Sequence, residues 1–415
     1  MPSTRRTVRL CYFSMLVVAL VGNLAPPLFI PLRTAFGLSF EQLGRFVLLN
    51  FLTQMTCVLV CGPLVDRLGA RPFALLGNGF VFAGVWLFAF ANRLFPAHPY
   101  TGLLLGTLVF SMGGGTLELL LSPIINATPS DRKAADMSLL HAFYAIGQIL
   151  TVLLTSLAIW FGAPWRTAVL CWSLVPLLAM CGFASVRIPP FVAAERRQRL
   201  RGLIRKPLFL TMLAGIFLAG ASELAVAQWV SAYAEKGLGL PKLLGDLGGP
   251  CLFAAMLGAG RLWMGLRPGT TRLEYVLPAS CAVTIAAYLV ACLAPWSWLA
   301  LSACAVAGLG ISLLWPGMLV TAAQHFPRGG ASMFAMLSAS GALGCALAPW
   351  AVGLVADGIA MHAGTPGLLA RAGVTLAPEA FGLRAGMLAA IVCPVFLLVL
   401  VRWIGRQPPD PDAVF

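Results

Sequence analysis

Twelve apolar blocks follow one another along the chain, separated by short charged or Gly/Pro-rich turns. Each block has the length of a membrane-spanning helix, which needs about 20 predominantly apolar residues. The predicted spans are residues 9–32, 42–64, 73–91, 100–126, 134–160, 166–187, 207–234, 245–266, 273–294, 297–323, 330–357 and 381–404. The pattern predicts an all-α membrane protein with 12 transmembrane helices.

One long polar interruption divides these spans six and six. It runs over residues 188–206 and predicts a basic cytoplasmic linker between an N-terminal six-helix bundle, residues 1–187, and a C-terminal six-helix bundle, residues 207–415. The halves also show a weak repeat, because FSMLVVALVGN at Phe13 resembles LTMLAGIFLAG at Leu210. Two pseudo-symmetric bundles are typical of transporters that expose a central site alternately to each side of the membrane.

Composition and charge agree with a membrane protein. The chain is 60% hydrophobic and only 10% charged, whereas soluble domains are about 25% charged. This excludes soluble enzymes, nucleic-acid binders and disordered proteins. Of the 28 Lys and Arg residues, 20 fall at helix ends on the side of the N-terminus, which predicts that both termini are cytoplasmic. The basic excess then faces anionic lipid headgroups, and we expect a monomer in a bacterial inner membrane.

Ionisable residues inside the predicted spans are the first functional candidates, since they are costly in lipid. Glu118, Glu223 and His141 lie well inside apolar runs. Glu118 precedes the turn near residue 130 by 12 residues and His141 follows it by 11, so both are expected at similar depth. All three are predicted to take part in proton coupling: Glu118 carries the proton, His141 tunes it, and Glu223 or a sodium site around Asn23 is the alternative. The alternatives are a Glu118–His141 pair that only joins two helices, and a structural role for Glu223 at a helix break.

Polar and aromatic residues near these groups are candidates for binding a substrate. Glu118 and Ser122 share one helix face, and His141, Tyr144 and Gln148 share another. Prolines after Asn23 and after Trp315 predict broken helices, which expose backbone groups. The predicted substrate-binding residues are Asn23, Ser122, Tyr144, Gln148, Gln228, Trp229 and Trp315. Packing remains an alternative for Asn23, and anchoring at the outer membrane interface for Trp229 and for Tyr233 one turn later.

A charged loop after the second predicted span carries a family resemblance. GPLVDRLGAR, residues 62–71, resembles the signature loop of the major facilitator superfamily, apart from Ala70, where that family prefers a basic residue. The resemblance implies the family's two-bundle fold and a cytoplasmic gate formed by Gly62, Asp66, Arg67, Gly69 and Arg71. A similar run at residues 353–357 falls on the outer side and is not taken as the gate.

A second resemblance covers about sixty residues. The runs GGGTLELLLSP, LHAFYAIG and GASELAVAQWVSAY are similar to those of the fucose–proton symporter branch, including its sodium-glucose-transporter-like relatives. The matching positions are Glu118, Pro123, His141, Gly147, Glu223, Trp229 and Tyr233. Ser122 and Asn23 depart from the branch pattern. The resemblance implies symport of a sugar, polyol or glycoside with a cation.

The sequence thus predicts a secondary active transporter that imports a small polar solute with a proton or a sodium ion. A proton-coupled drug or metabolite efflux antiporter is the alternative, but residues 134–160 contain one glycine and no proline, unlike the antiporter signature. A membrane enzyme or a sensor would need clustered catalytic groups or a soluble output domain. We predict no enzyme activity, no cofactor and no metal site, since no nucleotide-binding loop or complete set of metal ligands occurs.

Overall fold

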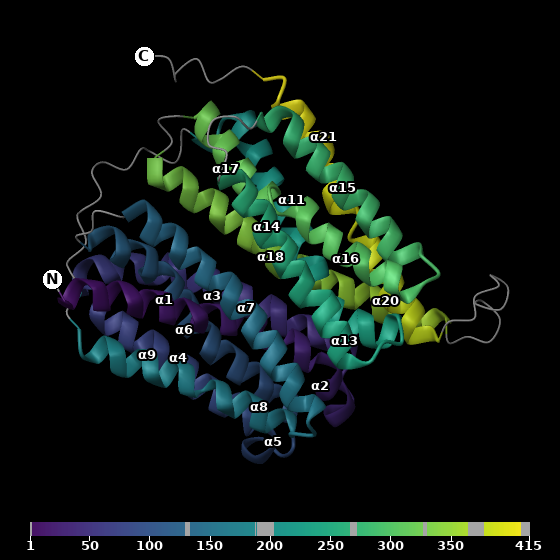
Figure 1. Ribbon diagram of the computed structural model, residues 1–415, viewed down its shortest axis with the longest axis horizontal. Coiled ribbons are helices and arrows are strands. Elements are labelled where there is room, and N and C mark those ends of the chain that lie inside the picture. Colours follow the sequence, from purple (N-terminus) through teal and green to yellow (C-terminus); the bar gives the residue numbers. More distant parts are fainter. Residues whose placement is uncertain are drawn as a thin grey trace. The chain divides into compact units, whose positions relative to one another are not determined.

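The computed structural model describes residues 2–128, 133–186, 188, 203–265, 272–326, 330–363 and 377–407, and these residues contain no β-strand. In its first half the helices are α1 (Pro2–Asn23), the 3-10 helix η1 (Pro26–Leu28), α2 (Phe29–Phe36), α3 (Phe40–Leu68), α4 (Ala70–Ala89), α5 (Ala91–Leu94), α6 (Pro99–Ala127), α7 (Lys133–Trp160), α8 (Trp165–Trp172) and α9 (Leu174–Ala184). Figure 1 labels most of these elements.

The second half is also helical throughout its described parts. It contains α11 (Pro207–Ala227), α12 (Val230–Ala232), the π-helix η2 (Tyr233–Gly237), α13 (Lys242–Asp246), the π-helix η3 (Leu247–Cys251), α14 (Leu252–Gly265), α15 (Leu273–Leu293), α16 (Ser297–Ile311), α17 (Leu314–His325), α18 (Gly330–Ala363), α20 (Pro378–Ala389) and α21 (Val392–Ile404).

Contacts divide the chain into two compact units. Unit 1 comprises Met1–Leu38 and Leu49–Ala193, and unit 2 comprises Ser39–Leu48 and Ala194–Phe415. Ser39–Leu48, which precedes the linker in the sequence, therefore groups with the later helices. The predicted bundle boundaries remain a prediction.

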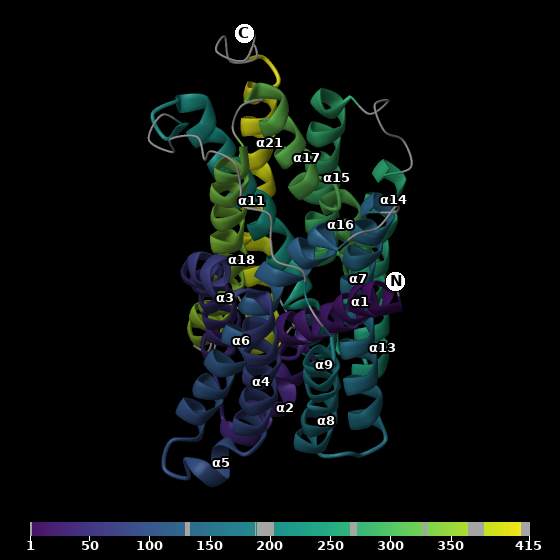
Figure 2. The ribbon, with the colours of Figure 1, turned by 90° about the vertical axis from the view of Figure 1, so that its left-hand side faces the viewer.

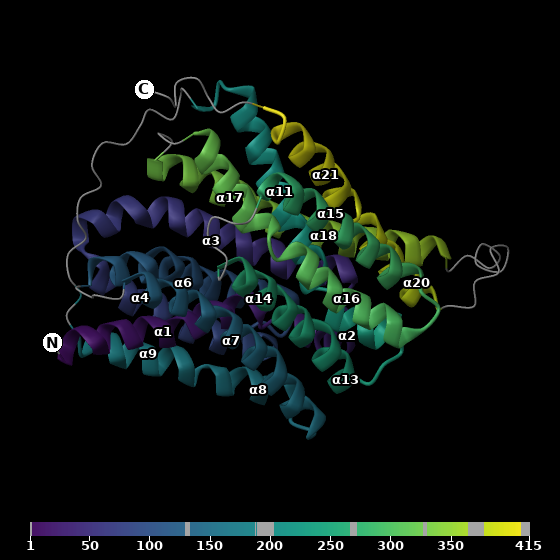
Figure 3. The same ribbon diagram turned by 45° about the horizontal axis from the view of Figure 1, so that its top comes forward.

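In unit 1 the long helices pack lengthwise. α4 lies along α6 and also contacts α9, and α1 contacts α6, α7 and α9 (Figure 3). In unit 2, α11 packs against α18 and α21, and α15 packs against α16 and α21 (Figure 2). The buried side chains in both units are mainly Leu, Val, Ala and Phe. The core therefore follows the apolar blocks of the sequence.

The predicted number of spans agrees with the described helices. Eleven helical segments are long and apolar enough to cross a membrane, and the bent pair Arg5–Asn23 and Pro26–Phe36, which meets at 42°, gives the twelfth. The predicted break in the first span is thus present. Pro26 and Pro27 have no N–H to continue the helix, so the last carbonyls of α1 need other partners. The tenth span is also broken, at residues 312–313, shortly before Pro316.

The start of α3 is held in unit 2 by several polar contacts. Ser39 and Gln42 form a reciprocal capping box: the Gln42 N–H donates to Ser39 Oγ over 3.1 Å, and the Ser39 N–H donates to Gln42 Oε1 over 2.9 Å. The Asp357 carboxylate of α18 accepts the N–H groups of Phe40, at 3.0 Å, and Glu41, at 2.5 Å. A carboxylate at this position also balances the positive end of the helix dipole.

Candidate functional site

The break at the end of α1 is supported by a buried polar network in unit 1. Asn50 of α3 donates from Nδ2 to the Val21 carbonyl of α1, at 3.0 Å. Its Oδ1 accepts Gln54 Nε2 at 2.8 Å and Ser111 Oγ of α6 at 2.7 Å. Asn50 and Gln54 are only 5% and 6% exposed. Because the helix breaks here, the Val21 carbonyl loses its helical N–H partner, and Asn50 donates to it instead. The network connects α1, α3 and α6.

The sequence analysis did not select Asn50, Gln54 or Ser111. A signal was present, because Asn50 and Gln54 are amides one helical turn apart in an apolar span. Their common partner, the Val21 carbonyl, is a backbone atom 29 residues away from Asn50 and is revealed only by the fold.

Several predicted substrate-binding residues lie near this break. Asn23 is buried and donates from Nδ2 to the Ala19 carbonyl of its own helix, at 2.9 Å. The Tyr144 hydroxyl of α7 is so close to Gly22 that a Cβ there would lie 3.1 Å from it. Gln148, one turn further along α7, is buried. The structure therefore brings Tyr144 to the end of α1, while the Asn23 amide bonds locally.

Glu118 and His141 have exposed side chains in unit 1, on α6 and α7 respectively. Glu118 follows Ser111 by seven residues, so it shares the helix face that carries the Asn50 network. Ser122, one turn later, is partly exposed. Among the described residues, the Glu118 carboxylate has neither a hydrogen-bond nor an ion-pair partner. The structure thus does not join Glu118 to His141, and the predicted proton role of both remains a prediction.

Glu223 of α11 is paired with Arg261 of α14 in unit 2. Arg261 Nη2 lies 3.0 Å and 3.3 Å from the two carboxylate oxygens. Arg261 Nε also lies 3.4 Å from the Ser312 carbonyl, at the break between α16 and α17. Helical side chains tilt toward the N-terminus of their helix, so Arg261 reaches back from the end of α14 into the unit. The sequence analysis counted it only as a charge at a helix end.

Trp315 of α17, in the same unit, contacts α11 one turn before Glu223. Its ring covers Gly220 of α11 and Gly341 of α18 so closely that a Cβ on either glycine would touch it. Gly220 is one turn before Glu223, and Trp315 follows Ser312 by three residues. The ring is partly exposed. Glu223, Arg261 and Trp315 therefore form one cluster, which we call the ion-pair cluster.

The predicted residues Gln228 and Trp229 lie where α11 ends. Both are buried, at 2% and 0% exposed. Trp229 Nε1 donates to the Pro349 carbonyl of α18 at 2.8 Å, and its ring meets that of Phe40 edge-on, with centroids 5.8 Å apart. In this structure Trp229 serves packing within unit 2, and its predicted contact with a substrate remains a prediction. Tyr233 is likewise buried and bonds the Ala291 carbonyl.

The predicted gate loop, residues 62–71, is mostly helical in the structure: residues 62–68 form the end of α3, Ala70 and Arg71 begin α4, and Gly69 alone joins the two helices. Gly69 forms the turn with φ 82°, a left-handed conformation that favours glycine. Arg71 Nη2 donates to the Ala184 carbonyl over 2.5 Å, at the last residue of α9, where a cation also balances the helix dipole. Arg67 is exposed and Gly62 is half-buried. The side chain of Asp66 lies outside the parts that the structure describes.

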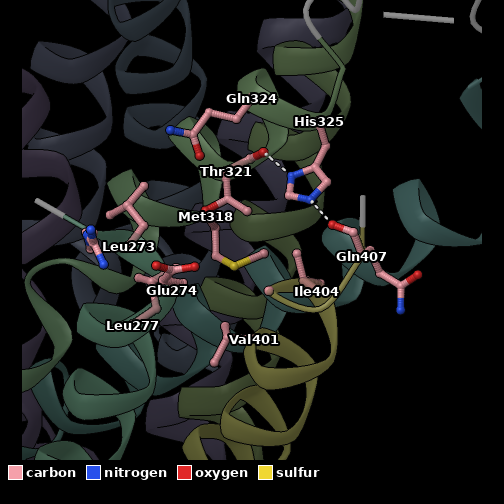
Figure 4. Close-up of a pocket in the computed structure, with 12 residues that line it drawn as sticks. Leu273, Glu274, Leu277, Met318, Thr321, Gln324, His325, Val401, Ile404 and Gln407 are labelled. Atoms are coloured by element: carbon pink, nitrogen blue, oxygen red, sulfur yellow. Dashed lines mark hydrogen bonds between the residues drawn. The ribbon is translucent and has the colours of Figure 1, made fainter. Parts of the chain in front are cut away.

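A separate cavity of about 350 Å³ opens in unit 2 among α15, α17 and α21 (Figure 4). Glu274, Thr321 and His325 are among its polar lining residues. Both His325 ring nitrogens lie near carbonyl oxygens, Thr321 at 2.9 Å and Gln407 at 3.3 Å. No predicted site residue lines it. Within the described residues, no group of three or more His, Cys, Asp or Glu side chains is arranged to hold a metal ion.

Comparison with a family model supports the motif in the gate loop. Residues 11–349 match the model of the Major Facilitator Superfamily. The chain belongs to this superfamily. Members are transporters, so the superfamily transporter predicted from the sequence is confirmed at this level.

Solved structures share the fold at low sequence identity. A bacterial homolog of the human lysosomal transporter Spinster, inward-facing and occupied, has a TM-score of 0.80 at 15% identity and covers 98% of each chain. The nucleoside transporter NupG, in a mutant form, has a TM-score of 0.76 at 11% identity, covering 97% of this chain and 99% of its own.

The E. coli fucose:proton symporter, also in a mutant form, has a TM-score of 0.61 at 14% identity, covering 98% of this chain and 100% of its own. The Spinster homolog thus scores higher than the branch that the sequence motifs resemble. At these identities the likeness concerns the fold.

Proposed function

We propose that this protein is a secondary active transporter, not an enzyme, that imports a small polar solute with a cation. The solute class is a sugar, polyol or glycoside, and the cation is a proton or a sodium ion. The observation that carries the proposal is Glu118, an exposed carboxylate without a described partner inside an apolar span. Such a group is costly in lipid unless it faces a water-filled path or binds a cation.

The surroundings of Glu118 support a binding role for unit 1. The Asn50 network fixes the end of α1, and the Tyr144 hydroxyl lies beside Gly22 at that end. Broken helices in transporters present backbone groups and helix ends to substrates and ions. In the proposal Glu118 binds the cation, His141 adjusts its charge, and Tyr144 with Gln148 contacts hydroxyl groups of the solute.

The gate loop completes the proposed cycle. The bond from Arg71 to the last residue of α9 supports a role in holding that end of unit 1. We propose that Gly62, Asp66, Arg67, Gly69 and Arg71 act in gating on the cytoplasmic side, in a bacterial inner membrane with both termini inside. Alternating access then moves solute and cation together.

The test is uptake into proteoliposomes that contain the purified protein. A panel of radiolabelled sugars, polyols and glycosides is offered with an inward proton gradient, an inward sodium gradient, or neither. Accumulation above equilibrium with one gradient supports the proposal. Efflux driven by an inward proton gradient, with no gradient-driven uptake, would instead identify the antiporter alternative.

A further inference from the structure

In the ion-pair cluster, part of the Arg261 guanidinium is not used in the described hydrogen bonds and can bind a ligand. Arg261 uses Nη2 for both oxygens of Glu223 and Nε for the Ser312 carbonyl. A guanidinium has five N–H donors, and among the described residues no partner bonds Nη1. The side chain of Arg261 is 42% exposed, while that of Glu223 is 16% exposed. The pair therefore covers most of the Glu223 carboxylate and leaves the Arg261 guanidinium more exposed.

The exposure of Arg261 does not place it on the outer, apolar face of α14. That face carries the exposed residues Leu252, Ala255, Ala259 and Leu262, which recur at intervals of three and four. Arg261 is instead in line with Ala254 and Leu257, which are 2% and 6% exposed. It thus lies on the face of the helix that turns toward the rest of unit 2.

The residues around Arg261 fit a ligand with an acidic group and a ring. Trp315 is partly exposed and is fixed from behind by Gly220 and Gly341. An aromatic ring of this kind offers a flat apolar face to the C–H face of a pyranose, and a guanidinium binds carboxylate and phosphate oxygens with two parallel hydrogen bonds. Both lie beside the same break between α16 and α17.

We propose that Arg261 binds the carboxylate or phosphate of an acidic sugar, and that Glu223 takes up a proton as this anion replaces it on the guanidinium. This inference rests on the proposed function and narrows its solute class. The empty pair carries one positive and one negative charge. An added monoanion alone, either a carboxylate or a singly protonated phosphate monoester, would leave a net charge of −1 in the cluster, whereas this monoanion together with a proton on Glu223 restores neutrality. Glu223 is only 16% exposed, and an uncompensated charge in such a partly buried place is unfavourable, so solute and proton bind together.

Few other ionisable groups face Glu223 in the described part of unit 2. The Cys345 thiol of α18 lies beside Gly220, where a Cβ would be 2.9 Å from its sulfur. The Tyr288 hydroxyl of α15 donates to the Ser222 carbonyl at 2.7 Å. Neither is an acid or a base as strong as the pair, so within unit 2 the pair determines how anion binding depends on protons, in addition to the cation that Glu118 is proposed to bind.

The experiment measures binding to the full chain in nanodiscs with matched probes. D-glucuronate, D-galacturonate and glucose 6-phosphate are each compared with the neutral sugar of the same ring, at acidic and at mildly alkaline pH. The variants are Arg261→Gln, Glu223→Gln, the neutral double variant Arg261→Gln/Glu223→Gln, and Arg402→Gln as a control on the exposed side of α21.

In the unaltered chain we expect at least one acidic probe to bind more tightly than its neutral counterpart, and more tightly at acidic pH. Arg261→Gln and the double variant should lower the affinity for that probe roughly tenfold to a hundredfold, which corresponds to the loss of hydrogen bonds to a charged group. Glu223→Gln should keep the binding but remove its pH dependence, and Arg402→Gln should change neither. The double variant leaves no charge unpaired, so it tests the inference even if Arg261→Gln alone fails to fold.

Four results would overturn the inference. Tighter binding of the neutral sugars than of all acidic probes would reject the acidic solute and leave the proposed function intact. If the double variant lost affinity for acidic and neutral probes equally, the role of the cluster would be structural. Acidic probes that bind the double variant as well as the unaltered chain would place their site elsewhere. Absence of binding by every probe would reject the acidic sugar, and the uptake panel of sugars, polyols and glycosides would then decide the proposed function separately.

Discussion

The Asn50 network makes a quantitative prediction about what stabilises the break in α1. Asn50→Ala removes three hydrogen bonds, to the Val21 carbonyl and from Gln54 and Ser111. Side-chain hydrogen bonds in membrane proteins average about 0.6 kcal/mol each, which gives about 2 kcal/mol for three. The Val21 carbonyl and the Gln54 amide also lose a partner in a buried place, which adds about 1 kcal/mol or more. We expect a loss of about 3 kcal/mol in the free energy of unfolding.

The assay is equilibrium unfolding in mixed micelles, followed by tryptophan fluorescence. Asn78→Ala is the matched control, because Asn78 is a fully buried amide whose bond goes to Ala74 of its own helix, at 2.8 Å. Ser111→Ala should fall between the two, since Asn50 keeps its other partners. If Asn50→Ala destabilised the protein no more than Asn78→Ala, the idea that this network holds the broken helix would be refuted.

Three further predictions concern the ends of helices. Asp357→Ala removes the acceptor at the start of α3 and should cost about 1 kcal/mol in the same unfolding assay, whereas Asp357→Asn should cost less; equal losses would contradict a role for the charge. Arg71→Gln should slow transport while leaving solute affinity unchanged, and a selective loss of affinity would contradict a gate role. Reporter fusions after Arg199 and after Arg371 should read cytoplasmic and external respectively, and the same side for both would refute the topology.

Much of the fold could be predicted from the sequence because lipid imposes a simple rule. Spans must be apolar over about 20 residues, so the predicted 134–160 and 273–294 closely match α7 and α15, Lys133–Trp160 and Leu273–Leu293. Prolines marked the break after α1. The grouping of Ser39–Leu48 with unit 2 was not visible in that pattern, because it depends on the capping of α3 by a residue more than three hundred positions away.

The candidate site was harder to predict than the spans. Scarcity of charge drew attention to Glu118 and Glu223, but scarcity does not give partners. Arg261 was counted as a charge at a helix end, since the sequence does not show that its side chain reaches back to Glu223. Trp229 was selected as an aromatic residue near that acid, and it lies fully buried. Periodicity indicates which face a residue occupies, whereas its contacts require the packing of several helices.

The most direct test of the central claim is transport by the Glu118→Gln variant. Glutamine keeps the size of the side chain and resembles the protonated acid, but it has no negative charge with which to bind a coupling cation. The measurement compares gradient-driven accumulation with solute counterflow in the same proteoliposomes, because exchange needs no net cation movement. We predict that accumulation is lost and counterflow is retained. Full gradient-driven accumulation by Glu118→Gln would contradict the account.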